Sequence, residues 1–298
     1  MRIRGKIKLH GTNGAVRVNY ATGEVSAQSR NRMLSVHEDN MGFANWVESQ
    51  REAWLSNIQG LSASEVTFYG EWAGPGIQER DAVTKIERKT FFVFALLIDE
   101  YMYSSPTTIK NFLSVGLDDV FVLPWQTKEY RISPSSKTSV ESFAEEVSDL
   151  AETVGDCDPF IKETFGIFGP GEGLVFTPGL SVSCDLYSML TFKVKCEAHR
   201  VKKSKKAATV KFMVPEDVQD FLDTFVTEQR LRQGLTEVCG GEFDKRKTSD
   251  FLKWFGSDVK KESQIELEEM GFEWKQVSKH VNSKAVSWYI ENCEKVAA

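Results

Sequence analysis

The chain has 298 residues, of which 41% are hydrophobic and 27% are charged, and this globular composition excludes a largely disordered protein. The net charge of −6 argues against a generally basic nucleic-acid coat. No apolar run approaches the roughly 18 residues of a membrane span, so the sequence predicts a soluble, cytoplasmic protein with no membrane partner, in the host cytoplasm if it is viral.

Alternating apolar and polar residues predict strands in the N-terminal part of the chain. The first, RIRGKIKL, has the pattern of a half-buried strand. A hairpin turning at Thr22 and Gly23 follows, then a helix over about residues 41–58 and strands over 64–72 and 89–98. The apolar face of the first strand holds Ile3, Gly5, Ile7 and Leu9, and its cationic face holds Arg2, Arg4, Lys6 and Lys8.

The middle of the chain combines a helical pattern with further strands. Residues 139–155 predict an amphipathic helix that faces the core, with Ser139 as its N-cap. Strand patterns return over residues 172–178 and 190–198.

The C-terminal part is helical throughout. Its first helix is expected to begin at Pro215 and to end at Gly234. A boundary drawn within residues 205–212 separates a β-rich α+β domain, 1–207, from a small all-helical domain, 208–298.

The segment between Lys193 and Lys211 is locally cationic, with Glu197 as its single acid. It is either a solvated linker or a contact with a phosphate backbone. The candidates for nucleic-acid binding in it are Arg200, Lys202, Lys203, Lys205 and Lys206.

Lys8 is a candidate nucleophile. A lysine attacks phosphorus only when unprotonated, and its usual pKa of about 10.4 keeps it charged at neutral pH. Like charges nearby lower such a pKa. Arg4 and Lys6 share the face of Lys8, and Lys193 with Lys195, which share one face of a later strand, are expected to converge on it.

Two carboxylates complete the set of candidate groups. They are Glu71 in FYGEWAGPGIQ and Glu172 in GPGEGLVFTP. Carboxylates near a triphosphate bind a divalent metal or a ribose hydroxyl. The combination of lysines and carboxylates suits nucleotidyl transfer.

A series of six short motifs resembles, in order, the motifs of the covalent nucleotidyltransferase superfamily. Within it, the chain is most similar to the double-stranded RNA ligases, typified by the second RNA ligase of T-even phages and the RNA-editing ligases of trypanosomes. The stretch GEWAGPGIQ is the most specific part, and the resemblance covers residues 1 to about 210. The motifs are KLHGTN (8–13), SRN (29–31), FYGEWAGPGIQ (68–78), FFVF (91–94), EGLVFTP (172–178) and FKVKC (192–196).

The resemblance implies a ligase adenylation domain of antiparallel sheets with flanking helices, in which Lys8 forms a phosphoramidate with AMP. Backbone groups of Ile7 and Leu9 would meet adenine, Phe94 would stack on it, and Glu71 would hold the AMP ribose.

The remaining roles also come from the resemblance. Asn13 would lie near the reacting phosphates, and Arg30 would hold the nucleotide and contact the terminal ribose of the RNA. Glu172 would place the metal or the lysine, and Lys193 with Lys195 would bind the α-phosphate.

The implied function is ATP-dependent sealing of 3'-OH/5'-phosphate nicks in duplex RNA, a repair reaction, by a monomer that uses Mg²⁺ or Mn²⁺. Alternatives are a DNA ligase or a GTP-dependent capping-type nucleotidyltransferase, although an appended OB-fold would then be expected. A catalytically silent RNA-binding relative is a further alternative, but binding alone needs no nucleophile.

The sequence departs from the family pattern in several places. Ala95 stands where members often have an acid, which puts a metal or RNA contact in question. Thr177 stands where they often have a lysine, which removes a cation from the nucleotide site. Arg32 competes with Arg30 for its role. Seven residues precede Lys8, fewer than in many relatives, so a reduced N-terminal edge or an incomplete start is expected.

The cysteines and histidines show no metal-site pattern in the sequence. The five cysteines are scattered without a CxxC pair, which indicates neither a disulfide framework nor a structural zinc site. The four histidines show no ligand spacing with cysteines or acids and are expected to be structural or exposed, with His10 as a spacer in its motif. They are His10, His37, His199 and His280.

Overall fold

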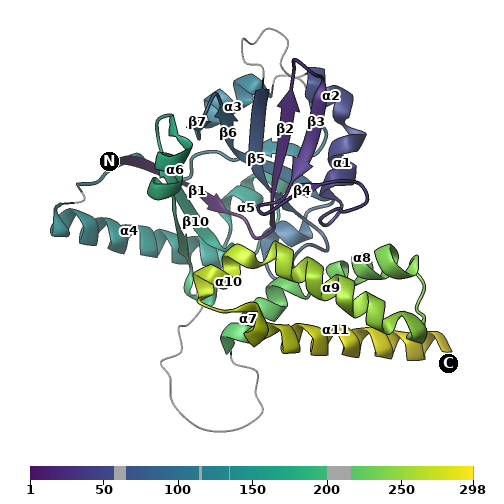
Figure 1. Ribbon diagram of the computed structural model, residues 1–298. Coiled ribbons are helices and arrows are strands. Elements are labelled where there is room, and N and C mark those ends of the chain that lie inside the picture. Colours follow the sequence, from purple (N-terminus) through teal and green to yellow (C-terminus); the bar gives the residue numbers. More distant parts are fainter. Residues whose placement is uncertain (57–64, 114–115, 134, 200–215, 298) are drawn as a thin grey trace. The chain divides into compact units, whose positions relative to one another are not determined.

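The chain divides into two compact units, Met1–Arg200 and Val201–Ala298. The expected domain boundary between residues 207 and 208 lies outside the described residues, so it stays a prediction. No described helix is both long enough and apolar enough to cross a bilayer. The computed structural model (Figure 1) describes residues 1–56, 65–113, 116–133, 135–199 and 216–297.

The first unit contains a four-stranded antiparallel sheet in the order β12-β10-β1-β9 among its described residues. Burial of Ile3 and Ile7 on one side of β1 confirms the predicted alternation. The other side is not simply exposed, because Lys6 is only 2% exposed. The strands are β1 (Arg2–Lys8), β9 (Tyr130–Arg131), β10 (Gly173–Pro178) and β12 (Phe192–Lys195).

Strand pairing in this sheet brings two lysines together across β10. Lys8 at the end of β1 lies opposite Gly173, and Gly173 lies opposite Lys195 at the end of β12. Directly opposite residues of antiparallel strands share a face, so Lys8 and Lys195 lie on the same side of the sheet. Lys193 lies two residues earlier on β12 and is therefore on the same side of the sheet as Lys195.

The same unit contains an eight-stranded sheet in the order β11-β7-β6-β5-β2-β3-β4, with β8 beside β6. The pairing of β6 with β8 is parallel, and the other pairings of this sheet are antiparallel among the described residues. The predicted hairpin turn forms, with Gly23 at a φ of 68° that suits glycine. The strands are β2 (Thr12–Asn19), β3 (Glu24–Gln28), β4 (Met33–Leu34), β5 (Glu65–Ala73), β6 (Thr90–Ile98), β7 (Tyr101–Tyr103), β8 (Val120–Val122) and β11 (Val182–Ser183).

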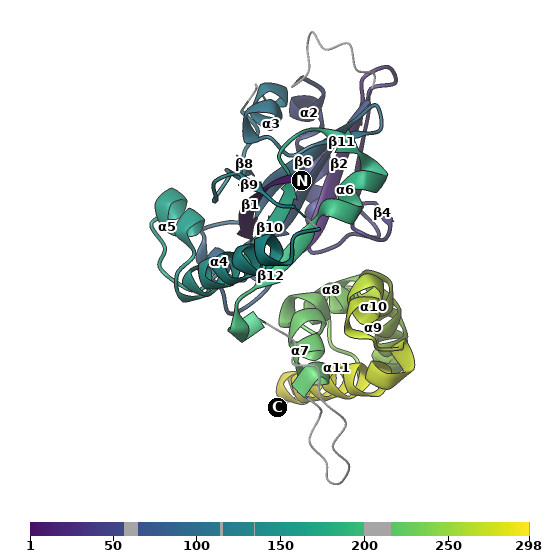
Figure 2. The ribbon, with the colours of Figure 1, turned by 90° about the vertical axis from the view of Figure 1, so that its left-hand side faces the viewer.

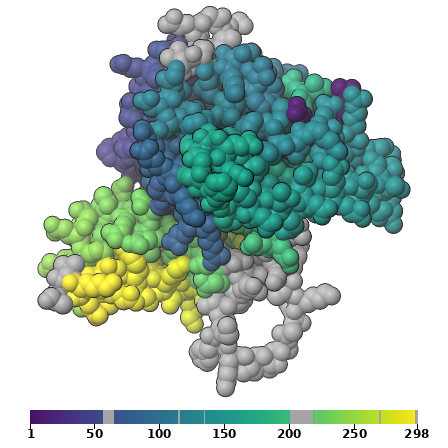
Figure 3. Space-filling view, turned by 180° about the vertical axis from the view of Figure 1, so that it is seen from behind, coloured from purple at the N-terminus to yellow at the C-terminus, as the bar shows by residue number. Residues whose placement is uncertain are grey.

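Helices cover these sheets, which confirms the α+β prediction (Figures 1 and 2). Helix α4 packs against β10 and β12 through Val147, Ala151 and Val154. Seen from behind (Figure 3), residues from the middle of the chain, coloured blue to teal, form most of the visible surface of this unit. The helices are α1 (Phe43–Ser49), α2 (Arg51–Ser56), η1 (Ala82–Lys85), α3 (Pro106–Phe112), α4 (Lys137–Asp156), α5 (Pro159–Phe165), α6 (Cys184–Leu190) and η2 (Glu197–His199).

Three predicted boundaries in this unit are wrong. The single helix expected over 41–58 is two helices, because the backbone of Gln50 leaves the helical conformation. Helix α4 begins earlier than expected, since the Ser136 hydroxyl, not that of Ser139, accepts the capping N–H bond. The strand expected over 190–198 is shorter, because the 3₁₀-helix η2 follows it.

The described part of the second unit is helical, as predicted. Its apolar core includes the fully buried side chains of Phe251, Phe255 and Tyr289. The single helix expected over 215–234 is two helices, because Thr227 begins a new one by accepting the N–H of Arg230 on its hydroxyl. Gly234 lies inside this second helix, where a Cβ would meet the Trp254 ring at 3.0 Å. The expected start at Pro215 lies outside the described residues. The helices are α7 (Glu216–Phe225), α8 (Glu228–Cys239), η3 (Lys245–Lys247), α9 (Thr248–Glu262), α10 (Gln264–Met270) and α11 (Trp274–Ala297).

The burial of Lys6 changes its chemistry. Its Nζ donates a hydrogen bond to the Phe94 carbonyl oxygen at 2.7 Å and lies 4.9 Å from the centre of the Trp125 ring. Burial lowers the pKa of Lys6 to about 7. Near neutral pH, Lys6 therefore carries only part of the positive charge that the sequence argument assigned to it beside Lys8.

We expect Lys6→Met to remove a pH dependence of stability. Because the pKa of Lys6 is lower in the folded than in the unfolded chain, the unfolded chain binds more protons between about pH 7 and pH 10, and wild-type stability rises with pH there. Relative to Lys6→Met, the wild-type free energy of unfolding should rise by about 1.4 kcal/mol per pH unit. Urea unfolding near pH 7.5 and pH 9.5 measures it. The exposed Lys137→Met is the control, and equal slopes for all three proteins would contradict the assignment.

We expect Gly173→Ala to destabilise the sheet that carries Lys8 and Lys195. Gly173 has a φ of 142°, and an added Cβ would lie 2.2 Å from the Val194 carbonyl oxygen on β12. The free energy of unfolding should fall by more than about 2 kcal/mol. Gly116→Ala, whose Cβ meets nothing within 4 Å, should change it by less than about 0.5 kcal/mol. Matching urea midpoints for the two variants would refute this.

Candidate active site

Glu172 lies between two lysines from neighbouring strands. It directly precedes β10, whose pairing with β1 and β12 places Lys8 and Lys195 on either side. Lys8 Nζ donates a hydrogen bond to Glu172 Oε2, and Lys195 Nζ lies 3.0 Å from Glu172 Oε1. The structure thus brings together three of the predicted catalytic side chains.

The charge of Glu172 is maintained by these lysines. Burial, which leaves Glu172 3% exposed, would by itself raise its pKa. The positive charges of Lys8 and Lys195 outweigh burial and hold the pKa of Glu172 well below its usual range. Glu172 is therefore an anion at neutral pH, and its carboxylate suits an oxygen-preferring divalent cation.

Glu71 enters the same site from β5 in the larger sheet. Its Oε1 accepts a hydrogen bond from the backbone N–H of Gly11 at 3.1 Å, and in the β2–β5 pairing it lies opposite Asn13. Burial raises the pKa of Glu71, although the charges of Lys8 and Arg30 act against this rise. The carboxylate is therefore within electrostatic reach of the candidate nucleophile.

The two candidate arginines have different surroundings. Arg30 acts electrostatically on Glu71. Arg32 instead donates to the carbonyl oxygens of Glu38 at 3.0 Å and Asp39 at 3.4 Å. Its electrostatic effect on Glu71 favours Arg30 over Arg32 as the arginine of the site.

Phe94 occupies an irregularity of β6. Tyr69 pairs with Ala95 but the next residue, Gly70, pairs with Val93, so Phe94 is the extra residue of a β-bulge. A bulge redirects a side chain, and bulges are common beside active sites. Phe94 is half-buried, consistent with a ring that has one face available.

Three further candidates are Ile7 and Leu9, whose backbone was expected to meet adenine, and Lys193, which was expected to bind the α-phosphate. The side chains of Ile7 and Leu9 are buried in the core, at 3% and 4% exposed, so only their backbone is available to a ligand. Lys193 is exposed on β12. The nucleic-acid-binding candidates of the basic segment lie outside the described residues: Arg200, Lys202, Lys203, Lys205 and Lys206.

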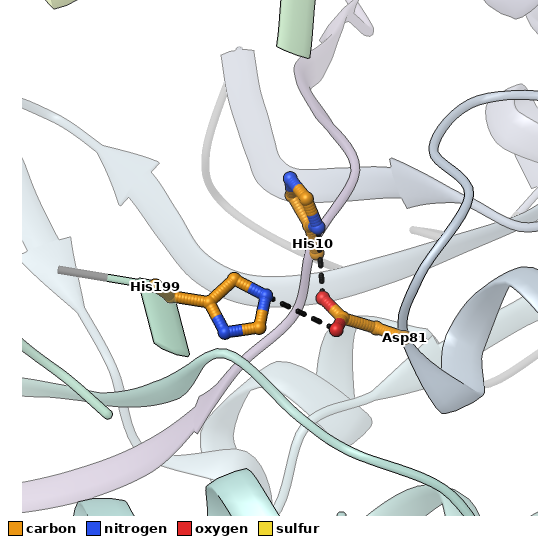
Figure 4. A group of neighbouring side chains, drawn as sticks. All are labelled: His10, Asp81 and His199. Atoms are coloured by element: carbon orange, nitrogen blue, oxygen red, sulfur yellow. Dashed lines mark ion pairs between the residues drawn. The ribbon is translucent and has the colours of Figure 1, made fainter. Parts of the chain in front are cut away.

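A cluster that sequence reasoning missed lies beside the site (Figure 4). His10 Nδ1 is 2.8 Å from Asp81 Oδ2, and His199 Nε2 is 3.1 Å from Asp81 Oδ1. Cys196 Sγ is 3.2 Å from the other nitrogen of His199. Both histidines therefore have an acidic neighbour, which the sequence did not predict because Asp81 is distant in the chain from each of them. The contact of His199 with Cys196, three residues earlier, was within reach of a spacing pattern and was missed.

The chain matches the family model described as RNA ligase over residues 3–195. A search of curated proteins found no match.

The chain is also similar to several solved structures. A mutant RNA ligase of Naegleria gruberi with ATP and Mn has a TM-score of 0.44 and 18% identity, over 66% of this chain and 50% of that one. The same ligase with PPi has a TM-score of 0.42 and 18% identity, over 66% and 50% of the two chains. A structure titled Pmar-Lig_Pre has a TM-score of 0.38 and 14% identity, over 65% and 42%. The chain spans about half the length of these Naegleria ligases.

The region matched by the family model is well over half of the chain. It contains Lys8, Glu71, Glu172 and Lys195, the side chains that meet in the candidate site. The chain belongs to the RNA ligase family.

Proposed function

We propose that this protein is an ATP-dependent RNA ligase that seals 3'-OH/5'-phosphate nicks in duplex RNA, acting as a monomer through a lysyl-AMP intermediate. The observation that carries the proposal is the placement of Glu172 between Lys8 and Lys195 in the region that matches the RNA ligase family. Burying a carboxylate between two lysines costs desolvation free energy that a purely structural role would not require. Charged groups of this kind are concentrated at functional sites.

In the first step, the Lys8 amine attacks the α-phosphorus of ATP. As the ammonium partner of Glu172, Lys8 first loses one proton to solvent, because only the neutral amine has a lone pair for attack. The Nζ–P bond then forms, the bond to pyrophosphate breaks, and a second proton leaves Nζ to solvent. Glu172 is a poor base because its pKa is so low, so its role is to hold Lys8 in position. Its carboxylate would also hold Mg²⁺ or Mn²⁺, which supplies positive charge to the phosphates.

The other side chains would bind the nucleotide. Lys195 and Lys193 neutralise charge that develops on the α-phosphate, an effect largest in a preorganised, partly buried site. Glu71 accepts hydrogen bonds from the ribose, and Phe94 stacks on adenine. Arg30 contacts the nucleotide and the ribose at the RNA end.

Two further steps complete ligation. The 5'-phosphate of the nick attacks the phosphorus of lysyl-AMP, which frees Lys8 and forms an RNA-adenylate. The neighbouring 3'-OH then attacks the 5'-phosphate, and AMP leaves. The basic segment that contains Lys202 and Lys203 would contact the RNA backbone, so substrate binding should weaken as salt rises.

A DNA ligase or a capping enzyme is less well supported. Either would be expected to carry an OB-fold of about five strands. The described residues of the second unit contain helices and no strand. A catalytically silent RNA-binding protein would have no need for the Lys8–Glu172 contact.

We expect Lys8 to become labelled by ATP radioactive in the α-phosphate. Wild type incubated with this ATP and Mg²⁺ should retain label through denaturing electrophoresis, because the phosphoramidate is covalent. Lys8→Arg keeps the charge that pairs with Glu172 but cannot act as the nucleophile, so its labelling should be lost. Lys195→Ala should reduce labelling about 10²-fold or more.

The exposed Lys137→Arg is the matched control and should be labelled like wild type. Absence of label in the wild type, or equal labelling of Lys8→Arg, would reject the lysyl-AMP intermediate. Stronger labelling by GTP than by ATP would favour the capping-type alternative.

We expect the protein to seal nicked duplex RNA faster than nicked duplex DNA or single-stranded RNA. A panel of nicked RNA duplex, nicked DNA duplex and single-stranded RNA, each with a 5'-phosphate, measures sealed product per time. Arg30→Ala should lower sealing more than Arg32→Ala, because Arg30 acts on Glu71 whereas Arg32 contacts its own loop. Faster sealing of nicked DNA would make the protein a DNA ligase.

A further inference from the structure

We propose that His10, Asp81 and His199 form a Zn²⁺ site that ties together the chain segments carrying Lys8 and Lys195. All three residues belong to the first unit, and their ligand atoms lie within 4.8 Å of one another. This site is separate from the cation position proposed at Glu172. Its test measures how much metal the protein binds, so the result does not depend on whether the protein is a ligase.

The arrangement of the cluster is that of converging ligands. Figure 4 shows the two imidazole rings directed at the two oxygens of one carboxylate, at 2.8 Å and 3.1 Å. Asp81 is 1% exposed. Although close, His10 Nδ1 and both Asp81 oxygens lack a partner with hydrogen-bond alignment. Each histidine nitrogen nevertheless lies at hydrogen-bond distance from one Asp81 oxygen, and a cation shared by the three groups would be bound by the same atoms.

The surroundings of His199 suit a metal ligand. A ligating histidine donates its second ring N–H to a neighbouring group, which fixes its tautomer. Cys196 Sγ is 3.2 Å from His199 Nδ1 and 3.7 Å from the Gly171 carbonyl oxygen. Its S–H donates to that oxygen, so the sulfur can accept the Nδ1–H of His199. In that tautomer the lone pair of Nε2 faces Asp81. Two acceptors would then face each other at 3.1 Å, and a cation that lies beside the pair and binds both atoms would remove their repulsion.

The ligand types select zinc. Two imidazole nitrogens and one carboxylate are a common Zn²⁺ set, with a fourth position open for water. Mg²⁺ prefers oxygen ligands and keeps several waters, so a site with two histidines disfavours it. The metal predicted here is therefore distinct in kind from the cation that accompanies ATP.

The position of the site indicates a structural role beside Lys8 and Lys195. His10 follows Lys8 by two residues, just after β1 ends, and His199 follows Lys195 by four residues in η2. Asp81 belongs to neither strand and precedes η1. A metal bound to all three would fix the ends of β1 and β12 on either side of Glu172, and so the spacing of the two lysines.

Metal titration of the 298-residue chain without a tag tests this. Protein stripped with EDTA and dialysed is titrated with Zn²⁺ by calorimetry, and with Co²⁺ as a probe whose visible absorption reports its ligands. We expect one tightly bound Zn²⁺ per chain in the wild type. Affinity should fall about 100-fold or more in His199→Ala and in Asp81→Asn, which keeps the shape but loses the charge. His37→Ala, at an exposed histidine outside the cluster, should bind like wild type.

Two outcomes would overturn the proposal. Wild type that binds no stoichiometric Zn²⁺ would mean that the three side chains only contact one another. Equal Zn²⁺ affinity in His199→Ala and His37→Ala would place the metal elsewhere, on cysteines for example. Circular dichroism verifies that each variant is folded. Zn²⁺ should also raise the melting temperature of the wild type and of His37→Ala but not of Asp81→Asn.

Discussion

The ion pairs of Glu172 with Lys8 and Lys195 are the interaction on which the candidate site depends. A carboxylate that is 3% exposed is stable as an anion only when positive charges compensate for its lost hydration. Each lysine comes from a different strand, so the pairing also links β1 and β12 through β10. The same contacts that stabilise the buried charge hold the candidate nucleophile beside a candidate phosphate-binding lysine.

The register of the small sheet makes this arrangement obligatory. Gly173 lies between the two lysines in the row of paired residues, and its backbone passes so close to Val194 that no side chain fits. A slip of β1 or of β12 by one residue would turn the lysine of that strand to the other face. The fold therefore specifies the distance between the lysines through backbone pairing, and glycine at position 173 permits the close approach of β10 to β12.

Several features of the site followed from sequence and others did not. The alternation of apolar and polar residues correctly predicted the first strand and the face on which Lys8 lies. The ordered series of motifs correctly predicted the family. The same alternation missed the burial of Lys6, because burial on a polar face depends on Trp125, which is distant in the chain. The bulge at Phe94 was also invisible, since it is a mismatch between two strands and not a property of one.

By itself, the sequence determined the family, the α+β character of the first unit and the helical character of the second, because these follow from local periodicity and from ordered motifs. Only the tertiary structure decided which charged groups meet. It set Glu172 between two lysines, lowered the pKa of Lys6 by burying it, and joined His10, Asp81 and His199. Electrostatic interactions and metal ligation depend on distances of a few ångströms through space, and strand pairing brings such groups together whatever their separation along the chain.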